Sequence, residues 1–211
     1  MRPTSCRTTD AGRRPAGPKP PTTARDHDPR PQGGLPPRSH HPGLPARPHR
    51  LDARWCGHIT YIPTEKGWLY LATVIDIASR RVVGWATADH LRTDLVADAL
   101  TAAWRQRRPT RPVIFHSDRG CQYTSQQFSA RAAEFGVRLS VGRTGQCWDN
   151  ALAESFFSTI KRELLGTSAW PSRAAAHTAI FDFIEGWYNL HRLHSSLGYL
   201  SPAEYETALA A

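Results

Sequence analysis

Two acidic residues and a lysine have the types and the spacing that suit chemistry on a phosphate group. Asp118 ends the apolar run "VIFHSD", and Glu154 lies in "DNALAESFF", with 35 residues between the two. Lys161 follows Glu154 by seven residues, which is two helical turns, so both side chains would share one helix face. Carboxylate oxygens are the ligands that Mg²⁺ prefers, and two such ions would clamp an in-line attack on phosphate. The structural alternative is that Asp118 caps a turn while Glu154 and Lys161 form a solvated helix face.

The elements that must position these side chains alternate in a regular order. Three strand-like segments rich in β-branched and aromatic residues come first, with short connections that favour an antiparallel meander. Helical spacing, strand-like runs and a closing glycine then predict the remaining elements. The expected strands are 58–64, 67–77, 80–88, 112–118 and 137–141, and the expected helices are 92–107, 125–136, 149–165 and 171–191. This order predicts a mixed α/β layered fold.

The N-terminal part of the chain differs sharply in composition from the rest. Residues 1–50 hold 12 of the 17 prolines and no Phe, Trp or Tyr, and they carry a net charge of +7 out of +9. Such a segment cannot bury enough apolar surface to offset its ordering entropy. We therefore expect a disordered, basic Pro/Arg-rich arm over residues 1–51 and a folded core with a C-terminal helical tail over residues 52–211.

Charge and cysteine content narrow the class of protein further. The excess of basic residues suggests a polyanionic partner. The four cysteines form no CxxC pair and no dense framework, which fits a reducing, cytoplasmic compartment. No run of 18 apolar residues occurs, so no membrane partner is expected.

Several longer motifs carry a family resemblance that covers about residues 54–206. They are "ITYIPT", "GWLYLATVIDIASRRVVGW", "IFHSDRGCQYTS", "RTGQCWDNALAESFFSTIKREL" and "YNLHRLHSSLGYLSPAEY". In their order and spacing the chain resembles the integrase-core (DDE) transposases of bacterial insertion sequences. The resemblance implies a ribonuclease-H-like fold, with a mixed five-stranded sheet flanked by helices. It also implies a catalytic triad of two aspartates and a glutamate, the last pair 35 residues apart, as in Asp118 and Glu154.

The activity implied by the resemblance is DNA cleavage and strand transfer during transposition and integration. The implied cofactor is Mg²⁺ or Mn²⁺ in a two-ion site, with Asp118 and Glu154 as metal ligands. The implied partners are double-stranded DNA, both as element ends and as target, and further copies of the chain. A cytoplasmic, nucleoid-associated protein is therefore expected.

His58 departs from the family pattern at a catalytic position. The family's first aspartate immediately precedes "ITYI", where this chain has His58. Neither Asp76, for which we expect a structural role, nor Asp52, near the arm boundary, is a good substitute. Imidazole is a softer ligand than Mg²⁺ prefers, although it binds Mn²⁺ or Zn²⁺. We therefore expect reduced or lost activity, the competing reading being a degenerate, inactive copy that only binds DNA or partners. A ribonuclease-H-like hydrolase is disfavoured because the tail and loop motifs match transposases.

Four further side chains are candidates for DNA contact. Lys161 would contact the element's end, and Arg119 and Arg143 lie beside the expected site, where they would contact phosphates or remain solvated. Asn150 would share a face with Glu154 and touch DNA or orient a ligand.

The N-terminal arm does not match the helical DNA-binding segment that relatives carry before the core. One hypothesis is that the reading frame shifts just before the core, so that residues 1–50 are not the ancestral segment.

Overall fold

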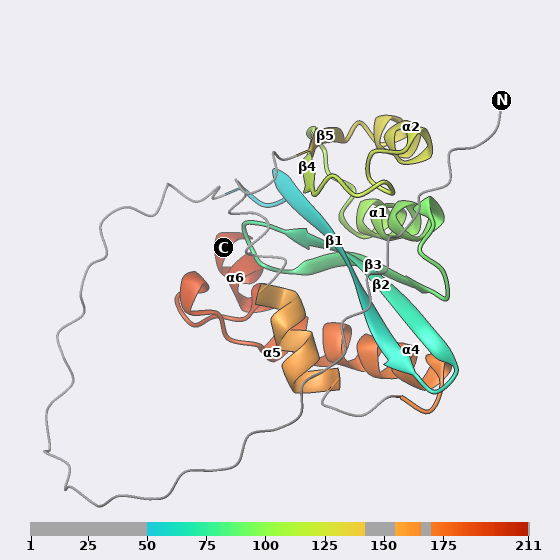
Figure 1. Ribbon diagram of the computed structural model, residues 1–211. Helices are drawn as coiled ribbons and strands as arrows, with labels where there is room; N and C mark the ends of the chain where they lie inside the picture. The colour runs from blue at the N-terminus through green and yellow to red at the C-terminus, as the bar shows by residue number, and fades with distance from the viewer. Residues whose placement is uncertain (1–49, 142–154, 166–169, 211) are drawn as a thin grey trace, which may run out of the picture. The chain divides into compact units, whose positions relative to one another are not determined.

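The computed structural model describes residues 50–141, 155–165 and 170–210, which all belong to one compact unit, Gly43–Ala211. Its centre is a five-stranded sheet with the strand order β3-β2-β1-β4-β5 (Figure 1). The first three strands form an antiparallel meander. Strand β4 pairs in parallel with β1, and β5 pairs in parallel with β4. Their bounds are β1 Arg54–Thr64, β2 Gly67–Asp76, β3 Val82–Ala88, β4 Ile114–Ser117 and β5 Arg138–Val141. The predicted mixed five-stranded sheet is confirmed.

One face of the sheet is covered by α1, Thr93–Arg107, and α2, Gln126–Glu134. Ser125 caps α2 by accepting a hydrogen bond from the Phe128 N–H, which satisfies one of the unpaired amides of the first turn. The shared core holds Trp55 and Phe115 from the sheet together with apolar residues of both helices. Gly84 permits the close approach of α1, because a Cβ there would lie 2.4 Å from the Ala103 nitrogen.

The other face is covered by helices from the second half of the chain. Residues 155–160 are helical and continue into the π-helical turn η1, Lys161–Leu165. Next comes one continuous helical segment, made of α4 Arg173–Phe181, η2 Asp182–Tyr188 and α5 Asn189–His191. Phe156, Ile160, Ile180 and Ile184 pack here against Ile62 and Leu71 of the sheet. The predicted helix over 171–191 is confirmed in extent, with a π-helical middle.

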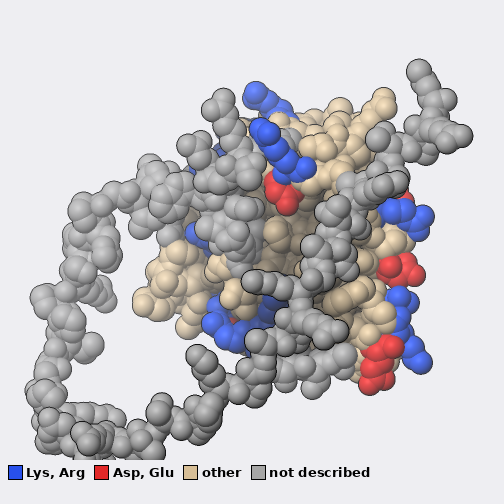
Figure 2. Space-filling model, in the orientation of Figure 1, with Lys and Arg blue, Asp and Glu red and all other residues tan. Residues whose placement is uncertain are grey.

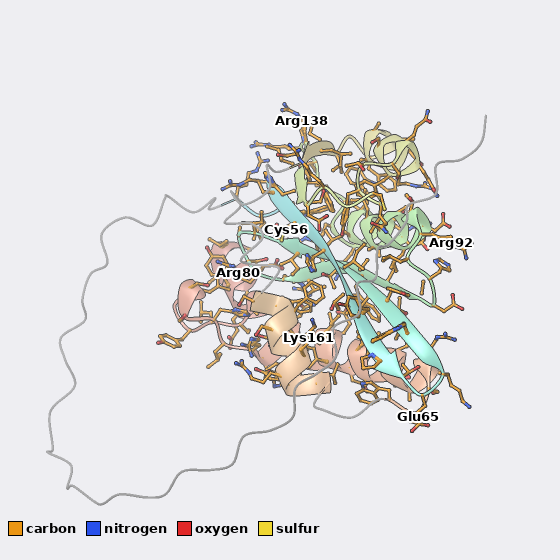
Figure 3. The ribbon with its side chains drawn as sticks, viewed as in Figure 1. Cys56, Glu65, Arg80, Arg92, Arg138 and Lys161 are labelled. Atoms are coloured by element: carbon orange, nitrogen blue, oxygen red, sulfur yellow. The ribbon has the colours of Figure 1, made fainter. Side chains whose placement is uncertain are left out.

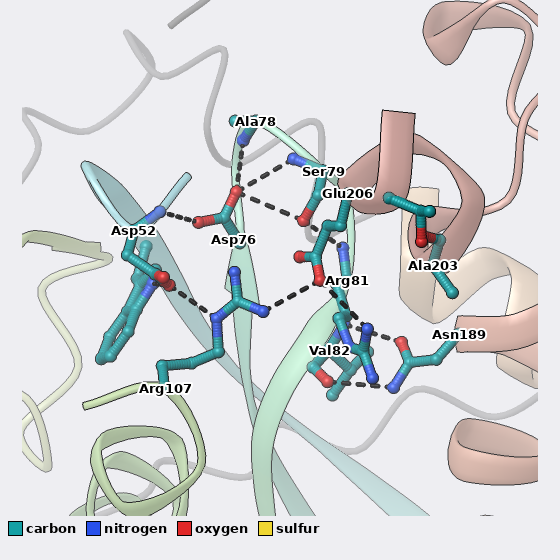
Figure 4. A network of polar contacts seen from close by, with 12 residues as sticks. Asp52, Asp76, Ala78, Ser79, Arg81, Val82, Arg107, Asn189, Ala203 and Glu206 are labelled. Atoms are coloured by element: carbon teal, nitrogen blue, oxygen red, sulfur yellow. Dashed lines mark hydrogen bonds and ion pairs between the residues drawn. The ribbon is translucent and has the colours of Figure 1, made fainter. Parts of the chain in front are cut away.

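The C-terminal tail docks on the sheet through charged side chains. After η3, Ser195–Leu197, the chain ends in α6, Pro202–Ala210. Glu206 Oε2 on α6 accepts hydrogen bonds from Arg81 at 3.0 Å and Arg107 at 2.9 Å, and Arg107 also donates to Asp52 at 2.8 Å (Figure 4). These groups are largely buried, so breaking one partner would leave an uncompensated charge.

Some predicted boundaries shift and some predictions are left open. Strand β1 begins at Arg54 rather than at residue 58, because Arg54, Trp55 and Cys56 pair with β4, a partner distant in sequence. Of the predicted arm, residues 1–51, all but residues 50 and 51 lie outside the described part, so the arm boundary stays a prediction. No helix in the described part of the chain is long and apolar enough to cross a membrane.

Candidate functional site

His58 lies within β1, and Asp118 directly follows the last residue of the neighbouring parallel strand β4. The β1–β4 ladder pairs Arg54 with Ile114, Trp55 with Phe115 and Cys56 with His116. Extended by two residues beyond this ladder, the same register would bring His58 opposite Asp118. The extended register therefore predicts that two positions 60 residues apart in the sequence are neighbours on adjacent strands.

Strand alternation predicts that both side chains belong to the same face of the sheet. Along β1, Trp55 and Ile59 face the core under α1 and α2, whereas Cys56 and Ile62 face the core under the helix of residues 155–165. His58 follows Cys56 by two residues and so shares its face. Its ring lies 4.7 Å from the ring of Phe157, centroid to centroid. Continued past the end of β4, the same alternation predicts that Asp118 faces the same way.

Gly57, directly before His58, leaves room for an aromatic ring of the neighbouring strand β4. An ideal Cβ on Gly57 would lie 2.3 Å from the Phe115 ring and 3.1 Å from the Tyr123 hydroxyl. Only glycine therefore lets the Phe115 ring of β4 cross beneath β1 at this point. The aromatic packing of Phe115, Tyr123 and Phe128 fixes the strand that carries Asp118.

Asp118 is an exposed carboxylate that accepts one hydrogen bond from a nearby backbone N–H. Its Oδ1 accepts a hydrogen bond from the Gly120 N–H at 2.9 Å. Burial and, second to it, the negative charge of Asp118 raise the pKa of Tyr123 well above its usual value. Asp118 therefore projects from the strand end towards solvent while it influences the packed ring behind it.

Lys161 lies across a pocket from His58. The pocket measures about 540 Å³ and is lined by His58, Phe157, Ser158, Lys161 and Arg162. The Lys161 ammonium lies 6.0 Å from the centre of the exposed Tyr61 ring on β1, within reach of a cation–π contact. In Figure 3, Lys161 projects from the helix of residues 155–165 near strands β1 and β2. The pocket thus combines two cationic groups with aromatic walls.

The charges on this face are biased towards basic groups. In the space-filling view, Lys and Arg side chains gather over the region of the helix of residues 155–165, whereas the opposite edge carries both signs (Figure 2). A basic surface beside a strand-end carboxylate suits a phosphodiester substrate, whose charge attracts lysine and arginine.

The two aspartates that might have replaced the missing one are committed elsewhere. Asp76 is fully buried, and its carboxylate accepts hydrogen bonds from the Asp52, Ala78 and Ser79 N–H groups at 2.7–2.9 Å. Asp52 Oδ1 accepts from Trp55 Nε1 and Arg107 Nε (Figure 4). Both therefore act in the scaffold, as the sequence predicted for Asp76.

The remaining predicted site residues fall into two groups. Arg119 is exposed beside Asp118, whereas Glu154, Asn150 and Arg143 lie outside the described residues. In the described part of the chain, no three His, Cys, Asp or Glu side chains group closely enough to hold a metal ion. The roles of these residues stay predictions.

Sequence reasoning missed several residues that line the site. Phe157, Ser158 and Arg162 flank Lys161 on the same helix, and Tyr61 lies beneath the Lys161 ammonium. Proximity to Lys161 could have suggested Arg162. Only the packing of β1 against this helix brings Tyr61 and Phe157 to the site, and no local pattern in the sequence shows that.

Solved structures with the same architecture define the class. The chain matches the simian T-cell lymphotropic virus intasome structure with a TM-score of 0.61 at 17% identity, over 80% of this chain and 59% of that one. It matches the HTLV-2 integrase catalytic core domain in complex with magnesium with a TM-score of 0.54 at 17% identity, over 73% of this chain and 95% of that one. At these identities the likeness shows the fold, a ribonuclease-H-like integrase core.

Closer relatives and family models narrow this to a family. Two family models described as "Integrase core domain" match residues 48–147 and 135–202. A transposase for insertion sequence element IS904 from Lactococcus lactis is 42% identical over 72% of this chain and 60% of its own length. Transposase InsF for insertion sequence IS3A from Escherichia coli is 44% identical over 74% of this chain and 54% of its own. The chain therefore belongs to the integrase core family, among the IS3-type DDE transposases, as the motifs predicted, and it spans little more than half the length of these relatives.

Proposed function

We propose that this chain is the catalytic core of a transposase that acts on double-stranded DNA, with activity reduced by His58. In the intact reaction, water attacks a phosphodiester at the element's end, and the DNA 3′-hydroxyl then attacks a second phosphodiester in the target. The observation that carries the proposal is the parallel register of β1 with β4, which points His58 towards Asp118, together with the pocket that His58 shares with Lys161. Further copies of the chain would assemble on the paired DNA ends.

The donor set only partly fits the divalent cation that the family uses. Asp118 offers an exposed carboxylate, and Glu154 would add a second, whereas His58 offers imidazole. Two carboxylates supply less negative charge than three, and imidazole suits Mn²⁺ better than Mg²⁺. A bound Mg²⁺ or Mn²⁺ would polarise the phosphodiester and activate the attacking oxygen.

The chain's own side chains would position the DNA. Lys161 and Arg162 can contact phosphate oxygens on one side of the pocket, and Arg119 can do so beside Asp118. The exposed Tyr61 ring offers a face on which an unpaired base at the element's end could stack. Asn150 and Arg143 are proposed to extend this contact surface.

The second candidate function is DNA binding without chemistry. His58 itself favours it, because losing one carboxylate ligand removes several kcal/mol of transition-state stabilisation, or about a thousandfold in rate. The basic and aromatic groups of the pocket would survive that loss. The two candidates therefore share a surface and differ in whether the metal site still works.

A cleavage and strand-transfer assay tests the proposal. The full chain and the His58→Asp variant would be incubated with duplexes carrying the element ends, Mg²⁺ and a DNA-binding N-terminal segment supplied in trans. The His58→Asp variant should cleave and transfer at least about a hundredfold faster than the unmodified chain. His177→Asp is the matched control, because His177 is exposed on α4 and bonds only Thr87 among the described residues.

The outcomes separate the candidates. Equal cleavage by the unmodified chain and by His58→Asp would show that histidine is a working ligand. No cleavage by either protein, with DNA binding retained, would favour the binding-only function. Asp118→Asn in the His58→Asp background should abolish any restored activity, because it removes the facing carboxylate.

A further inference from the structure

A second polar pocket lies on the other side of the helix of residues 155–165. It is small, about 30 Å³, and gathers side chains from three parts of the chain. Arg80 comes from the turn between β2 and β3, Ser155 and Thr159 come from the helix, and Arg192 and His194 follow α5. The Lys161 pocket opens on residues 157, 158, 161 and 162 of the same helix, so the two pockets use different helix faces.

The lining of this pocket is rich in hydrogen-bond donors. Two guanidinium groups, three hydroxyl-bearing side chains and an imidazole line it together with the Phe156 ring, and no acidic side chain of the described residues does so. His194 Nε2 is buried and has no hydrogen-bond partner among the described residues. A buried polar atom without a partner costs free energy, so a ligand that satisfies it would stabilise the fold.

The backbone around the pocket is firmly held. His194 donates its N–H to the Leu200 carbonyl at 3.1 Å, and its own carbonyl accepts from the Leu197 and Tyr199 N–H groups. The Tyr188 hydroxyl donates to the Arg80 carbonyl at 3.3 Å, and the Tyr188 ring meets the His194 ring edge-on at 5.4 Å. The donors are therefore arranged before any ligand arrives.

The local charge is positive around the imidazole. Burial and then the charges of Arg192 and Arg80 lower the pKa of His194 to about 4. Among the described residues, Glu163 is a carboxylate close to the pocket, and it pairs with Arg192 at 2.6 Å and with Arg162 at 3.5 Å. A guanidinium has five N–H donors, so Arg192 can hold Glu163 and still serve the pocket.

From these contacts we propose that the pocket formed by Arg80, Ser155, Thr159, Arg192 and His194 binds a phosphate group. Arginine pairs and hydroxyl donors recognise tetrahedral oxyanions, and the unpartnered Nε2–H tautomer of His194 would complete the donor set. The bound phosphate would tie the C-terminal tail to the helix that carries the catalytic face. The pocket lies apart from His58 and Asp118, so this inference stands whether or not the chain cleaves DNA.

The first arm of the test uses inorganic phosphate and the full chain. At pH 7.5 and constant ionic strength, replacing chloride by 10 mM phosphate should raise the melting temperature by about 2–4 °C. Phosphate should also raise the pKa of the His194 imidazole, followed by NMR, because the anion offsets the repulsion from Arg80 and Arg192. Arg80→Gln and His194→Phe should each lose most of the thermal shift.

Matched controls separate pocket binding from general charge effects. Arg138→Gln removes an exposed arginine at the far end of the molecule from Lys161 (Figure 3), and His191→Phe changes an exposed histidine of the same tail. Both controls should keep the phosphate shift. The proposal would be overturned if replacing chloride by phosphate left the melting temperature unchanged. It would also be overturned if the shift survived both Arg80→Gln and His194→Phe.

The second arm identifies the source of the phosphate. Duplex DNA binding would be followed by fluorescence anisotropy over a range of salt concentrations. If a DNA phosphodiester occupies the pocket, Arg80→Gln should lower the salt slope by about 1 relative to Arg138→Gln. If phosphate binding is lost in Arg80→Gln while DNA binding is unchanged, the occupant is a free phosphate or a small phosphorylated molecule.

Discussion

Two aspartates of the sheet, Asp76 and Asp118, lie in opposite surroundings. Asp76 is fully buried at the end of β2 and accepts hydrogen bonds from three backbone N–H groups. Burial raises the pKa of Asp76, and hydrogen bonds from the Ser79 and Asp52 backbones partly offset this. Asp118 is exposed past the end of β4, where among the described residues it accepts only the Gly120 N–H.

The difference shows that an aspartate can either stabilise a turn of the scaffold or stay available to bind a ligand. The oxygens of Asp76 are occupied by the turn that leads into β3, so they cannot bind a ligand. The oxygens of the exposed Asp118 keep lone pairs that are open to solvent. Scaffold substitutions should therefore cost stability, and site substitutions should cost activity while leaving the fold intact.

The largest expected effect is on the scaffold aspartate. Asp76→Ala should lower the free energy of unfolding by about 3–5 kcal/mol, because it leaves several buried N–H groups unpaired. Asp118→Ala, at an exposed position, should change it by less than about 0.5 kcal/mol. Urea denaturation of both variants measures the contrast, and similar losses in the two would show that the comparison is wrong.

A pair of glycines tests the helix-covered face. In Gly84→Ala the new Cβ would lie 2.4–2.5 Å from backbone atoms of α1, so α1 must move and the free energy of unfolding should fall by about 2–3 kcal/mol. Gly186→Ala meets no atom within 4 Å and sits in a helical segment, so it should be neutral or stabilise by up to about 1 kcal/mol. Thermal and urea unfolding distinguish the two, and an unaffected Gly84→Ala variant would contradict the close packing of α1.

The tail histidine makes stability depend on pH. The pKa of His194 is about 4 in the folded chain and 6.5 in the unfolded one, so the unfolded state binds more protons between these values. Stability should therefore fall as the pH falls from about 6.5 to about 4, by about 1–2 kcal/mol because the half-buried ring is partly screened by solvent. Urea titrations across this range should show the loss, and it should vanish in His194→Phe but persist in His191→Phe.

The smallest expected effect on stability comes from the anchor of Asp118. A Cβ on Gly120 would lie 2.9 Å from Asp118 Oδ1, so Gly120→Ala should turn the flexible carboxylate aside. The free energy of unfolding should change by less than about 0.5 kcal/mol. In the His58→Asp background the cleavage rate should nevertheless fall about tenfold, because ligand geometry is disturbed. Unchanged cleavage would mean that the Asp118 position is not set by this contact.

The sequence predicted most of the architecture because its signals are local. Alternating apolar residues and the short connections before Gly67 and after Asp76 predict the meander, and Ser125 and Gly136 bound α2 as caps do. The sequence places the start of β1 too late, because Arg54, Trp55 and Cys56 pair with β4, a distant contact that spacing does not reveal, and Trp55 and Cys56 also pair with β2.

The site was predictable in its polar residues but not in its surroundings. Asp118, Lys161 and His58 were found through motif spacing. The ring contact of His58 with Phe157, and the hydrogen bonds that bind Asp52 to Arg107, depend on tertiary packing. The pocket around His194 depends on tertiary packing in the same way. His194 lies more than 30 residues from Thr159 and over 100 from Arg80 in the sequence, so no local pattern predicts that they share a pocket.

Metal-dependent melting of the His58→Asp variant tests the central claim most directly, since it needs no DNA. The claim is that residues 58 and 118 face each other as two halves of one metal site. With 10 mM Mg²⁺, His58→Asp should gain about 2–4 °C in melting temperature, whereas the unmodified chain and His58→Asp/Asp118→Asn should gain little. Without metal, His58→Asp should be neutral or less stable, because close carboxylates repel. An equal Mg²⁺ gain in all three proteins would contradict the account.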